Sequence, residues 1–150
     1  DAVAILPIRM GDNGDEEVLL IRQYRHPIRH IMWEIPAGLL DVEGETAELA
    51  AHRELGEEVD MVAGSLEPLI NMYATTGCSD EQYMIFIARD VHASDVVFDR
   101  QDEEAEIESF WVPLSRVCQA IYAGDLRSPT LVTAILAYIG KQSVFLNGSK

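Results

Sequence analysis

The stretch EIPAGLLDVEGETAELAAHRELGEEVDM, residues 34–61, is the most informative part of this chain for its fold. It places Glu54, Glu57 and Glu58 together near the end of one predicted helix. Like charges three or four positions apart on a helix repel each other, by roughly 0.2–0.5 kcal/mol per pair. Folding gains nothing from that repulsion. Either these carboxylates form a solvated acidic face, or they hold something positive.

The helix that carries these acids has two distinct faces. Ala51, Leu55 and Val59 fall four residues apart and predict a buried apolar stripe. Glu54 and Glu58 are also four apart and share another face. Carboxylate oxygens arranged in this way suit Mg²⁺ or Mn²⁺, which also bind phosphate oxygens. Two carboxylates ~4 Å apart repel by about 4 kcal/mol at an effective dielectric constant near 20, and a divalent cation reverses that sign.

The strand end before the helix supplies a further candidate ligand. Gly38 lets another group approach the backbone closely, and the carbonyl of Ala37 is a candidate oxygen ligand. Arg53 precedes Glu57 by four residues, so an ion pair between them would fix the glutamate rotamer. The metal ligands that we expect are Ala37, Glu54, Glu57 and Glu58.

The overall charge restricts the classes of partner. The 150 residues include 26 acidic and 11 basic side chains, for a net charge of −15. That balance argues against a nucleic-acid surface, which needs clustered Lys and Arg. It permits an anionic small molecule if metal ions bridge the like charges. No run reaches the ~18 apolar residues of a membrane span, so we expect no membrane partner.

Size and cysteine usage indicate the domain organisation. Apolar residues make up 48% of the chain, which suffices for the core of one domain over residues 1–150. The chain begins at Asp1 directly before an apolar run, so we expect that an N-terminal segment has been trimmed or is absent. Cys78 and Cys118 lie far apart without a CxxC pair, which predicts two free thiols in a cytoplasmic protein.

Predicted strands and helices follow one another along the chain. Apolar runs bounded by turn residues predict strands, and Pro36 restricts its run to a strand end. Gly124 is expected to stop one helix, and Ser128-Pro129 to open the last one. The expected strands are 2–9, 18–24, 30–37, 66–74, 82–91 and 107–114, the helices are 46–59, 114–124 and 129–140, and the loops include 75–81 and 100–106. This pattern predicts an α/β (α+β) fold, an α/β/α sandwich around a mixed β-sheet.

The residues of the opening stretch resemble the signature of the Nudix hydrolases, G-x5-E-x7-R-E-U-x-E-E-x-G-U, where U is apolar. The matching positions, in order, are Gly38, Glu45, Arg53, Glu54, Leu55, Glu57, Glu58 and Met61. Two positions depart from it. Six residues instead of five separate Gly38 from Glu45, and Asp60 replaces the final Gly. Asp enters the left-handed backbone region at a modest cost, so we expect the site to persist.

Within that family the flanking segments resemble the ADP-ribose pyrophosphatases. The similar segments are VLLIRQYRHPI (18–28), WEIPAGLLD (33–41) and TTGCSDEQYMIFIA (75–88). Those enzymes usually carry a Pro just before the Gly of the last segment, where this chain has Thr76. The resemblance implies metal-dependent hydrolysis of ADP-ribose to AMP and ribose 5-phosphate, with Mg²⁺ or Mn²⁺, in a homodimer of nucleotide metabolism. The alternatives are another nucleoside diphosphate derivative (a nucleotide sugar, a dinucleotide or a noncanonical triphosphate) and a nucleotide-binding Nudix domain without hydrolysis.

The resemblance also assigns roles to residues of this chain. The implied catalytic residues are Glu57 and Arg53, with Glu103 as first and Glu104 as second choice for the general base. A solvated acidic loop is the competing interpretation of Glu103 and Glu104. The expected substrate-binding residues are Arg22, Tyr24, Arg25, Glu34 and Gly38. An Arg pairs with phosphates and an aromatic ring stacks on a base, whereas core or interface packing is the alternative for Tyr24 and Trp33.

Overall fold

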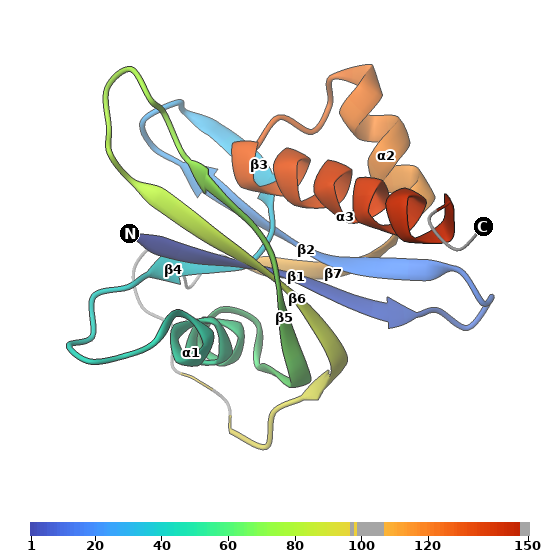
Figure 1. Cartoon of the computed structure of the whole chain (residues 1–150), viewed down its shortest axis with the longest axis horizontal. Coiled ribbons are helices and arrows are strands. Elements are labelled where there is room, and N and C mark those ends of the chain that lie inside the picture. The colour runs from blue at the N-terminus through green and yellow to red at the C-terminus, as the bar shows by residue number, and fades with distance from the viewer. Residues whose placement is uncertain (97, 99–106, 148–150) are drawn as a thin grey trace.

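The computed structural model describes residues 1–96, 98 and 107–147, and only the backbone of 145–147. Seven strands and three helices are described within these ranges (Figure 1). They are β1 (Ala2–Met10), β2 (Glu16–Arg25), β3 (His30–Glu34), β4 (Ala37–Leu39), α1 (Ala47–Val59), β5 (Met61–Tyr73), β6 (Gln82–Ala93), β7 (Glu108–Pro113), α2 (Leu114–Ala123) and α3 (Pro129–Asn147).

The sheet is mixed and is built around β1. Its strand order is β3-β2-β1-β6-β5, with β4 also paired to β1 and β7 also paired to β2. β1 runs parallel to β6, with Ala2 opposite Tyr83 and Pro7 opposite Ala88. The other pairings within the described residues are antiparallel. β6, which covers the predicted strand 82–91, lies between β1 and β5.

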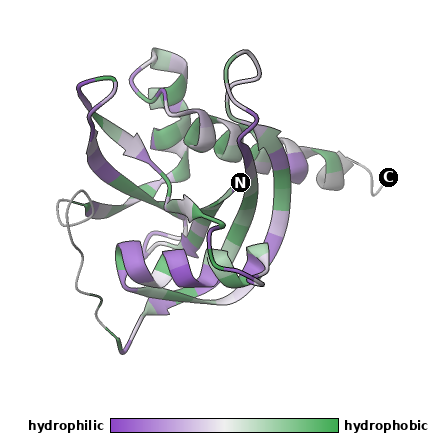
Figure 2. Ribbon diagram, turned by 90° about the vertical axis from the view of Figure 1, so that its left-hand side faces the viewer, coloured by the Kyte–Doolittle hydropathy of each residue, from purple (hydrophilic) through white to green (hydrophobic). Residues whose placement is uncertain are grey.

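Successive residues of β1 face different helices. Val3 and Ile5 belong to the cluster that contains the apolar stripe of α1. Ala4 and Leu6 belong to the cluster that α2 and α3 complete. Figure 1 shows α1 on one side of the sheet and α2 and α3 on the other, and in Figure 2 the long strands are largely green whereas much of α1 is purple. The predicted α/β/α sandwich with a mixed sheet is therefore confirmed.

Several element boundaries differ from the sequence-based expectations. β5 begins at Met61 instead of residue 66, because residues 61–65 continue the pairing with the end of β6 despite Gly64 and Ser65. α3 continues through Gly140 to Asn147. A glycine inside a helix costs about 1 kcal/mol relative to Ala but does not by itself end the helix.

The predicted helix end at Gly124, the predicted helix start at Pro129 and the predicted loop 75–81 agree with the structure. α2 ends at Gly124, which adopts the left-handed conformation with φ 83°. The segment 30–37 divides into β3 and β4 around Pro36, whose carbonyl accepts a hydrogen bond from the Ile5 N–H at 2.8 Å. The predicted acidic loop 100–106 lies outside the described residues.

Candidate active site

The local sequence fixes both ends of α1. The Thr46 hydroxyl caps the first turn and accepts the Leu49 N–H at 3.3 Å. Asp60 ends the helix in the left-handed region, with φ 52° and ψ 40°, and its N–H donates to the Gly56 carbonyl at 3.0 Å. Asp60 therefore takes the conformation expected at the position where the signature has Gly. The two departures from the signature, the longer loop and Asp60, therefore do not disturb α1 or the positions of its acids.

Glu54 lies against the backbone of Gly38. The residue is only 7% exposed. A β-carbon added at Gly38 would lie 1.9 Å from Cδ of Glu54 and 2.1 Å from each of its carboxylate oxygens. The absence of a side chain at Gly38 is thus the condition for this position of the Glu54 carboxylate, as the sequence predicted for a close approach.

Glu58 is held by the strand end. It is 6% exposed, and its Oε2 accepts the Ala37 N–H at 2.8 Å. Such a bond to the backbone stabilises the ionised carboxylate. The same bond brings the Glu58 carboxylate next to Ala37. The sequence analysis predicted the carbonyl of Ala37 as a metal ligand.

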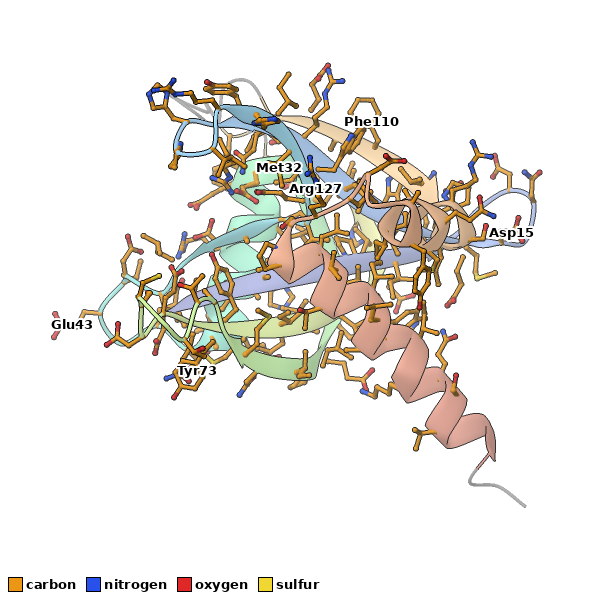
Figure 3. All side chains as sticks on the ribbon, turned by 90° about the horizontal axis from the view of Figure 1, so that it is seen from above. Asp15, Met32, Glu43, Tyr73, Phe110 and Arg127 are labelled. Carbon is orange, nitrogen blue, oxygen red and sulfur yellow. The ribbon has the colours of Figure 1, made fainter. Side chains whose placement is uncertain are left out.

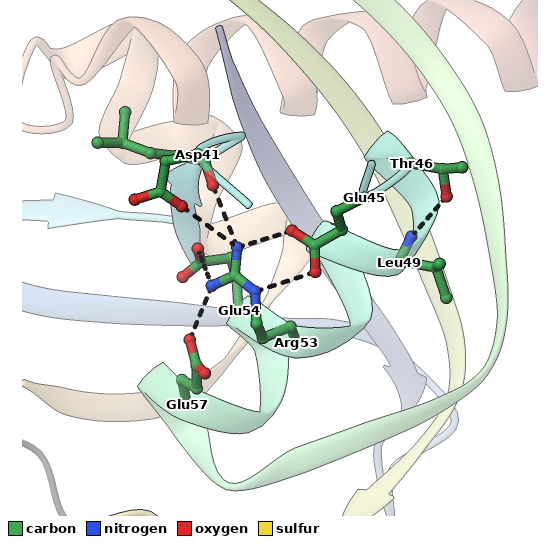
Figure 4. A network of polar contacts seen from close by, with 8 residues as sticks. Asp41, Glu45, Thr46, Leu49, Arg53, Glu54 and Glu57 are labelled. Atoms are coloured by element: carbon green, nitrogen blue, oxygen red, sulfur yellow. Dashed lines mark hydrogen bonds and ion pairs between the residues drawn. The ribbon is translucent and has the colours of Figure 1, made fainter. Parts of the chain in front are cut away.

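Arg53 joins the remaining acids (Figure 4). Its Nη1 donates to Glu54 Oε1 at 2.7 Å and to Glu57 Oε2 at 2.9 Å. Its Nε and Nη2 donate to the two oxygens of Glu45 at 3.1 and 3.0 Å. Nη2 also donates to the Leu39 carbonyl at 3.2 Å. The predicted ion pair between Arg53 and Glu57 is confirmed, as one bond of a larger network.

The network determines the charge state of Arg53. Its hydrogen bonds to Glu45, followed by those to Glu57 and Glu54, hold the pKa of the Arg53 guanidinium well above its ordinary value. The guanidinium is therefore a permanent cation between Glu54 and Glu57. Repulsion between these acids is compensated without any bound ion, which explains how the helix tolerates them.

The donor chemistry at this end of α1 fits a hard divalent cation. Carboxylates and a backbone carbonyl are the oxygen ligands that Mg²⁺ and Mn²⁺ prefer. Glu57 is the most exposed of the three glutamates, so its carboxylate has room to turn. Within the described part of the chain, however, no three His, Cys, Asp or Glu side chains already converge as a metal cluster.

A cavity of about 500 Å³ adjoins this cluster at Ala37. Arg25 and Glu34 line it and form an ion pair, with Arg25 Nε 3.0 Å from Glu34 Oε2. Gln23 donates to the same oxygen at 3.1 Å. Burial lowers the pKa of Arg25, but its hydrogen bond to Glu34 and the charge of that group outweigh burial and leave the pKa raised. The cavity thus carries a fixed cation beside the acidic cluster.

Arg22 and Tyr24 do not line this cavity. Side chains alternate between the two faces of a strand, so Arg22 and Tyr24 lie on the face of β2 opposite to that of Arg25. The Arg22 Nε donates to Glu108 Oε2 at 2.9 Å, and its guanidinium lies 5.8 Å from the centre of the Trp33 ring. The structure therefore brings together Arg25, Glu34 and Gly38 of the expected substrate residues and separates the other two.

The sequence analysis did not predict some residues of this region, and two that it did predict lie outside the described residues. Tyr83, Ser128 and Thr130 line the cavity, and their sequence positions carry no motif that would indicate it. The period of two along β2 could have separated Arg22 and Tyr24 from Arg25. Glu103 and Glu104, the candidates for the general base, lie outside the described residues.

Comparison with known proteins identifies the family. A sequence model of the NUDIX domain matches residues 1–132. The chain belongs to the NUDIX domain family, as its signature predicted. It is similar to the ADP-ribose pyrophosphatase of Mycobacterium tuberculosis, with 34% identity over 139 residues that cover 91% of this chain and 63% of that protein. It is also similar to the ADP-ribose pyrophosphatase of Bacillus subtilis, with 36% identity over 90 residues that cover 60% of this chain and 46% of that protein.

The fold is shared with a solved structure. The crystal structure of an ADP compounds hydrolase matches 100% of this chain and 76% of that chain, with a TM-score of 0.75 and 21% identity. At this identity the likeness concerns the fold alone. The chain spans only 63% and 46% of the length of the two relatives.

Two further findings concern the described residues as a whole. Among them no helix has the length and apolar character needed to cross a membrane. Cys78 and Cys118 are both free thiols, as their spacing predicted.

Proposed function

We propose that this chain is a pyrophosphohydrolase that uses Mg²⁺ or Mn²⁺ to cleave ADP-ribose into AMP and ribose 5-phosphate. The observation that carries the proposal is the position of the acidic cluster of α1. Glu54 and Glu58 are almost buried against the backbone of Gly38 and Ala37, directly beside a cavity with a fixed arginine. The names of the two relatives support ADP-ribose as the substrate.

In this proposal Glu54, Glu57, Glu58 and the Ala37 carbonyl hold the cation. A bound divalent ion polarises the diphosphate, neutralises the charge that develops on it and lowers the pKa of a water molecule. Glu54 and Glu58 are kept in place by the backbone, whereas Glu57 is the acid that turns toward the ion. Arg53 then orients Glu57 and screens the repulsion among the carboxylates.

The remaining roles concern the substrate and the water. Arg25, at the cavity wall next to Ala37, is placed to donate hydrogen bonds to a phosphate oxygen. Glu103, with Glu104 as the second candidate, takes the proton of the attacking water. The water oxygen bonds to one phosphorus, and the bond from that phosphorus to the bridging oxygen breaks.

The decisive experiment measures AMP formation from ADP-ribose with and without Mg²⁺. Glu57→Gln and Glu58→Gln should reduce turnover to the metal-free level. Glu48→Gln is the matched control, because it removes one acid from an exposed position of the same helix and should leave turnover unchanged. Absence of AMP formation by the unmodified protein, with saturating metal, would contradict the proposal. Separate Glu103→Gln and Glu104→Gln variants identify the base, since the correct one should lower kcat without weakening metal binding.

Thr76 supports a second candidate substrate. The Pro that usually accompanies ADP-ribose specificity is absent, so another nucleotide sugar, a dinucleotide or a noncanonical triphosphate is the alternative. A substrate panel ranked by kcat/KM separates these, and a tenfold preference for ADP-ribose would exclude the alternatives. A domain that binds a nucleotide without hydrolysis would instead show binding by calorimetry and no product at any metal concentration.

A homodimer is the proposed assembly. Tyr24 and Ile31 on neighbouring strands and Phe110 on β7 are exposed large side chains. Phe110 packs edge-on against Trp33, with ring centres 5.3 Å apart. Exposed apolar side chains gathered on neighbouring strands are typical of association surfaces. Arg22 and Tyr24 would then reach the substrate of the second copy.

Sedimentation measurements test this assembly. Ile31→Glu should yield monomers, whereas Val144→Glu, an equally exposed apolar position on α3, should leave the assembly unchanged. We also propose a cytoplasmic location, because the two free thiols fit a reducing compartment.

A further inference from the structure

Asp60 joins the end of α1 to the chain that follows β6. Its carbonyl accepts the Ser94 N–H at 2.8 Å, and its Oδ1 accepts the Phe98 N–H at 3.1 Å. Ser94 Oγ in turn accepts the Val96 N–H at 3.1 Å. In Figure 1 the yellow stretch after β6 lies on the same side of the sheet as α1. The side chain of Asp60 thus adds a second anchor, four residues beyond the first.

The second anchor depends on the departure from the signature. A backbone carbonyl is present whatever residue stands at position 60, so a glycine there would still accept the Ser94 N–H. Only a side-chain oxygen can accept the Phe98 N–H from this position. Asp60 holds φ at 52°, a conformation that costs an aspartate more than a glycine. The hydrogen bond to Phe98 therefore offsets the use of aspartate at a position that glycine adopts more easily.

Gly56 makes room for the same segment. The residue is buried inside α1, two positions after Glu54 and one before Glu57. A β-carbon added there would lie 3.2 Å from Cε2 of Phe98, so the ring rests close to the helix backbone. Glycine is unfavourable in a helix interior. Gly56 and Asp60 are thus two locally unfavourable residues that contact one segment, and such positions are expected at functional sites.

The position of Phe98 limits how far the chain beyond it can reach. Glu103 follows Phe98 by five residues and precedes Glu108, in β7, by five. An extended chain spans at most about 3.6 Å per residue, so Glu103 can lie no farther than about 18 Å from either. Measured from Ser94 instead, nine residues would allow about 32 Å. The anchor at Phe98 therefore keeps the proposed general base within reach of the acids of α1.

We propose that Asp60 is a positioning residue of the active site, whose side chain fixes Phe98 against α1 and thereby restricts where the general base can lie. The inference rests on the proposed function, because the anchor serves catalysis only if the base comes from the chain after Phe98. In this account Asp60 touches neither the substrate nor the metal. Its loss should therefore slow the chemical step without weakening the binding of either.

The test replaces Asp60 by the glycine of the signature. Asp60→Gly removes the bond to Phe98 and relieves the left-handed conformation, so the fold should persist. We expect the Phe98 amide hydrogen to exchange with solvent roughly threefold to tenfold faster, because one hydrogen bond is lost. The kcat should fall by a similar factor, roughly threefold to tenfold, because the base is less well placed. The KM of ADP-ribose and the Kd of Mn²⁺ should stay within about twofold, which a general structural defect would not leave unchanged.

Asp60→Asn and Asp90→Gly are the matched controls. The asparagine oxygen can accept the same hydrogen bond, and asparagine also enters the left-handed region. Asp90 has the same φ of 52° but lies in β6, where it lines a separate cavity. Both variants should keep kcat and the exchange rate of the Phe98 amide within about twofold of the wild type. Asp15→Asn controls for the loss of one negative charge, since Figure 3 shows Asp15 in the turn between β1 and β2, well away from α1.

Three results would overturn the proposal. An unchanged exchange rate in Asp60→Gly would show that the side chain does not hold Phe98. Faster exchange together with wild-type kcat would show that the anchor has no catalytic role. Equal losses of kcat in Asp60→Gly and Asp90→Gly would trace the effect to the backbone conformation and not to the hydrogen bond.

Hydrogen exchange also separates failure of this inference from failure of the proposed function, because it requires no turnover. If the unmodified protein with Mg²⁺ forms no AMP from ADP-ribose, the proposed function fails. Faster exchange at Phe98 in Asp60→Gly, but not in Asp60→Asn, would then still support the anchor. Equal exchange in all the variants would reject the anchor even if ADP-ribose is hydrolysed.

Discussion

The carboxylate of Glu54 occupies the space that a side chain at Gly38 would fill. A β-carbon there would lie 1.9 Å from Cδ of Glu54, far inside van der Waals contact. Because Glu54 is also nearly buried, its carboxylate has little room to move aside. A glycine in the short strand β4 and a glutamate in the middle of the next helix therefore depend directly on each other.

Gly38→Ala should displace Glu54 from its position. We expect kcat to fall by roughly 10–100-fold, the range found when the surroundings of metal ligands are altered. The melting temperature should fall as well, because the nearly buried Glu54 carboxylate has little room to move aside. Gly140→Ala is the control, since no atom lies within 4 Å of the position of its added β-carbon. Unchanged kcat in Gly38→Ala would show that the position of Glu54 does not matter for turnover.

Arg53→Lys should be harmful although the charge is kept. An ammonium group cannot bond simultaneously to both oxygens of Glu45, to Glu54, to Glu57 and to the Leu39 carbonyl. Loss of charged hydrogen bonds in a partly buried network should lower the free energy of unfolding by about 1.5–3 kcal/mol.

Turnover should also fall in Arg53→Lys, because Glu57 loses the group that orients it. Urea denaturation and steady-state kinetics measure the two effects. Arg127→Lys, at an exposed position, provides the baseline for the same chemical change. Wild-type stability in Arg53→Lys would mean that a positive charge alone stabilises the cluster of acids, without the several N–H donors of a guanidinium.

Gly56→Ala should stabilise the protein. Alanine in a helix interior is favoured over glycine by about 1 kcal/mol. The added β-carbon would lie 3.2 Å from Cε2 of Phe98, so this ring must move by a few tenths of an ångström. Phe98 is partly exposed and has room to do so. The free energy of unfolding should therefore rise, but by less than the full helix preference of alanine over glycine.

The same substitution in a Phe98→Ala background isolates the contact between the two residues. There the gain should reach the full helix preference, because the obstructing ring is gone. Urea unfolding of the wild type, Gly56→Ala, Phe98→Ala and the double variant gives the coupling energy between the two positions directly. A net destabilisation by Gly56→Ala alone would show that Phe98 is fixed in place, for example through the bond from its N–H to Asp60 Oδ1 at 3.1 Å.

The contact between Glu67 on β5 and Lys141 on α3 should contribute to stability above acidic pH only. The hydrogen bond from Lys141 lowers the pKa of Glu67 below its ordinary value of 4.5. A carboxyl with a lowered folded-state pKa adds stability above its unfolded-state pKa, and this is lost as pH falls through the folded-state pKa.

The stability difference between wild type and Lys141→Met should therefore be present at pH 7 and should be lost as pH falls from 4.5 through the lowered folded-state pKa of Glu67. Because both side chains are substantially exposed, we expect it to stay under about 1 kcal/mol. Urea unfolding across this pH range measures it. A difference that does not decline as the solution is acidified would mean that Lys141 acts through packing of its aliphatic chain.

The sequence predicted the elements that depend on local patterns. The stripe of Ala51, Leu55 and Val59 and the left-handed Asp60 follow from side chains within a few residues. The same holds for the close approach at Gly38, because the signature itself encodes it. Local chemistry therefore sufficed for α1 and for the arrangement of its acids.

What the sequence did not reveal depends on distant parts of the chain. β5 begins early because the end of β6 pairs with residues 61–65, which have no strand-like alternation. Tyr83, Ser128 and Thr130 meet at one cavity only after α3 packs beside β3. The alternation of side chains along β2 could have shown that Arg22 and Arg25 lie on opposite faces. The sequence could not show which of these faces points to the cavity.

The parallel pairing of β1 with β6 has a consequence for biosynthesis. Pro7 is paired with Ala88, so the first strand must wait for a segment about eighty residues later before its neighbour emerges from the ribosome. Until then the nascent chain holds an apolar strand with one open edge, which is the kind of surface that chaperones bind. Contacts this far apart in sequence slow folding, so completion of the sheet, more than formation of α1, should limit how fast newly made protein acquires its site.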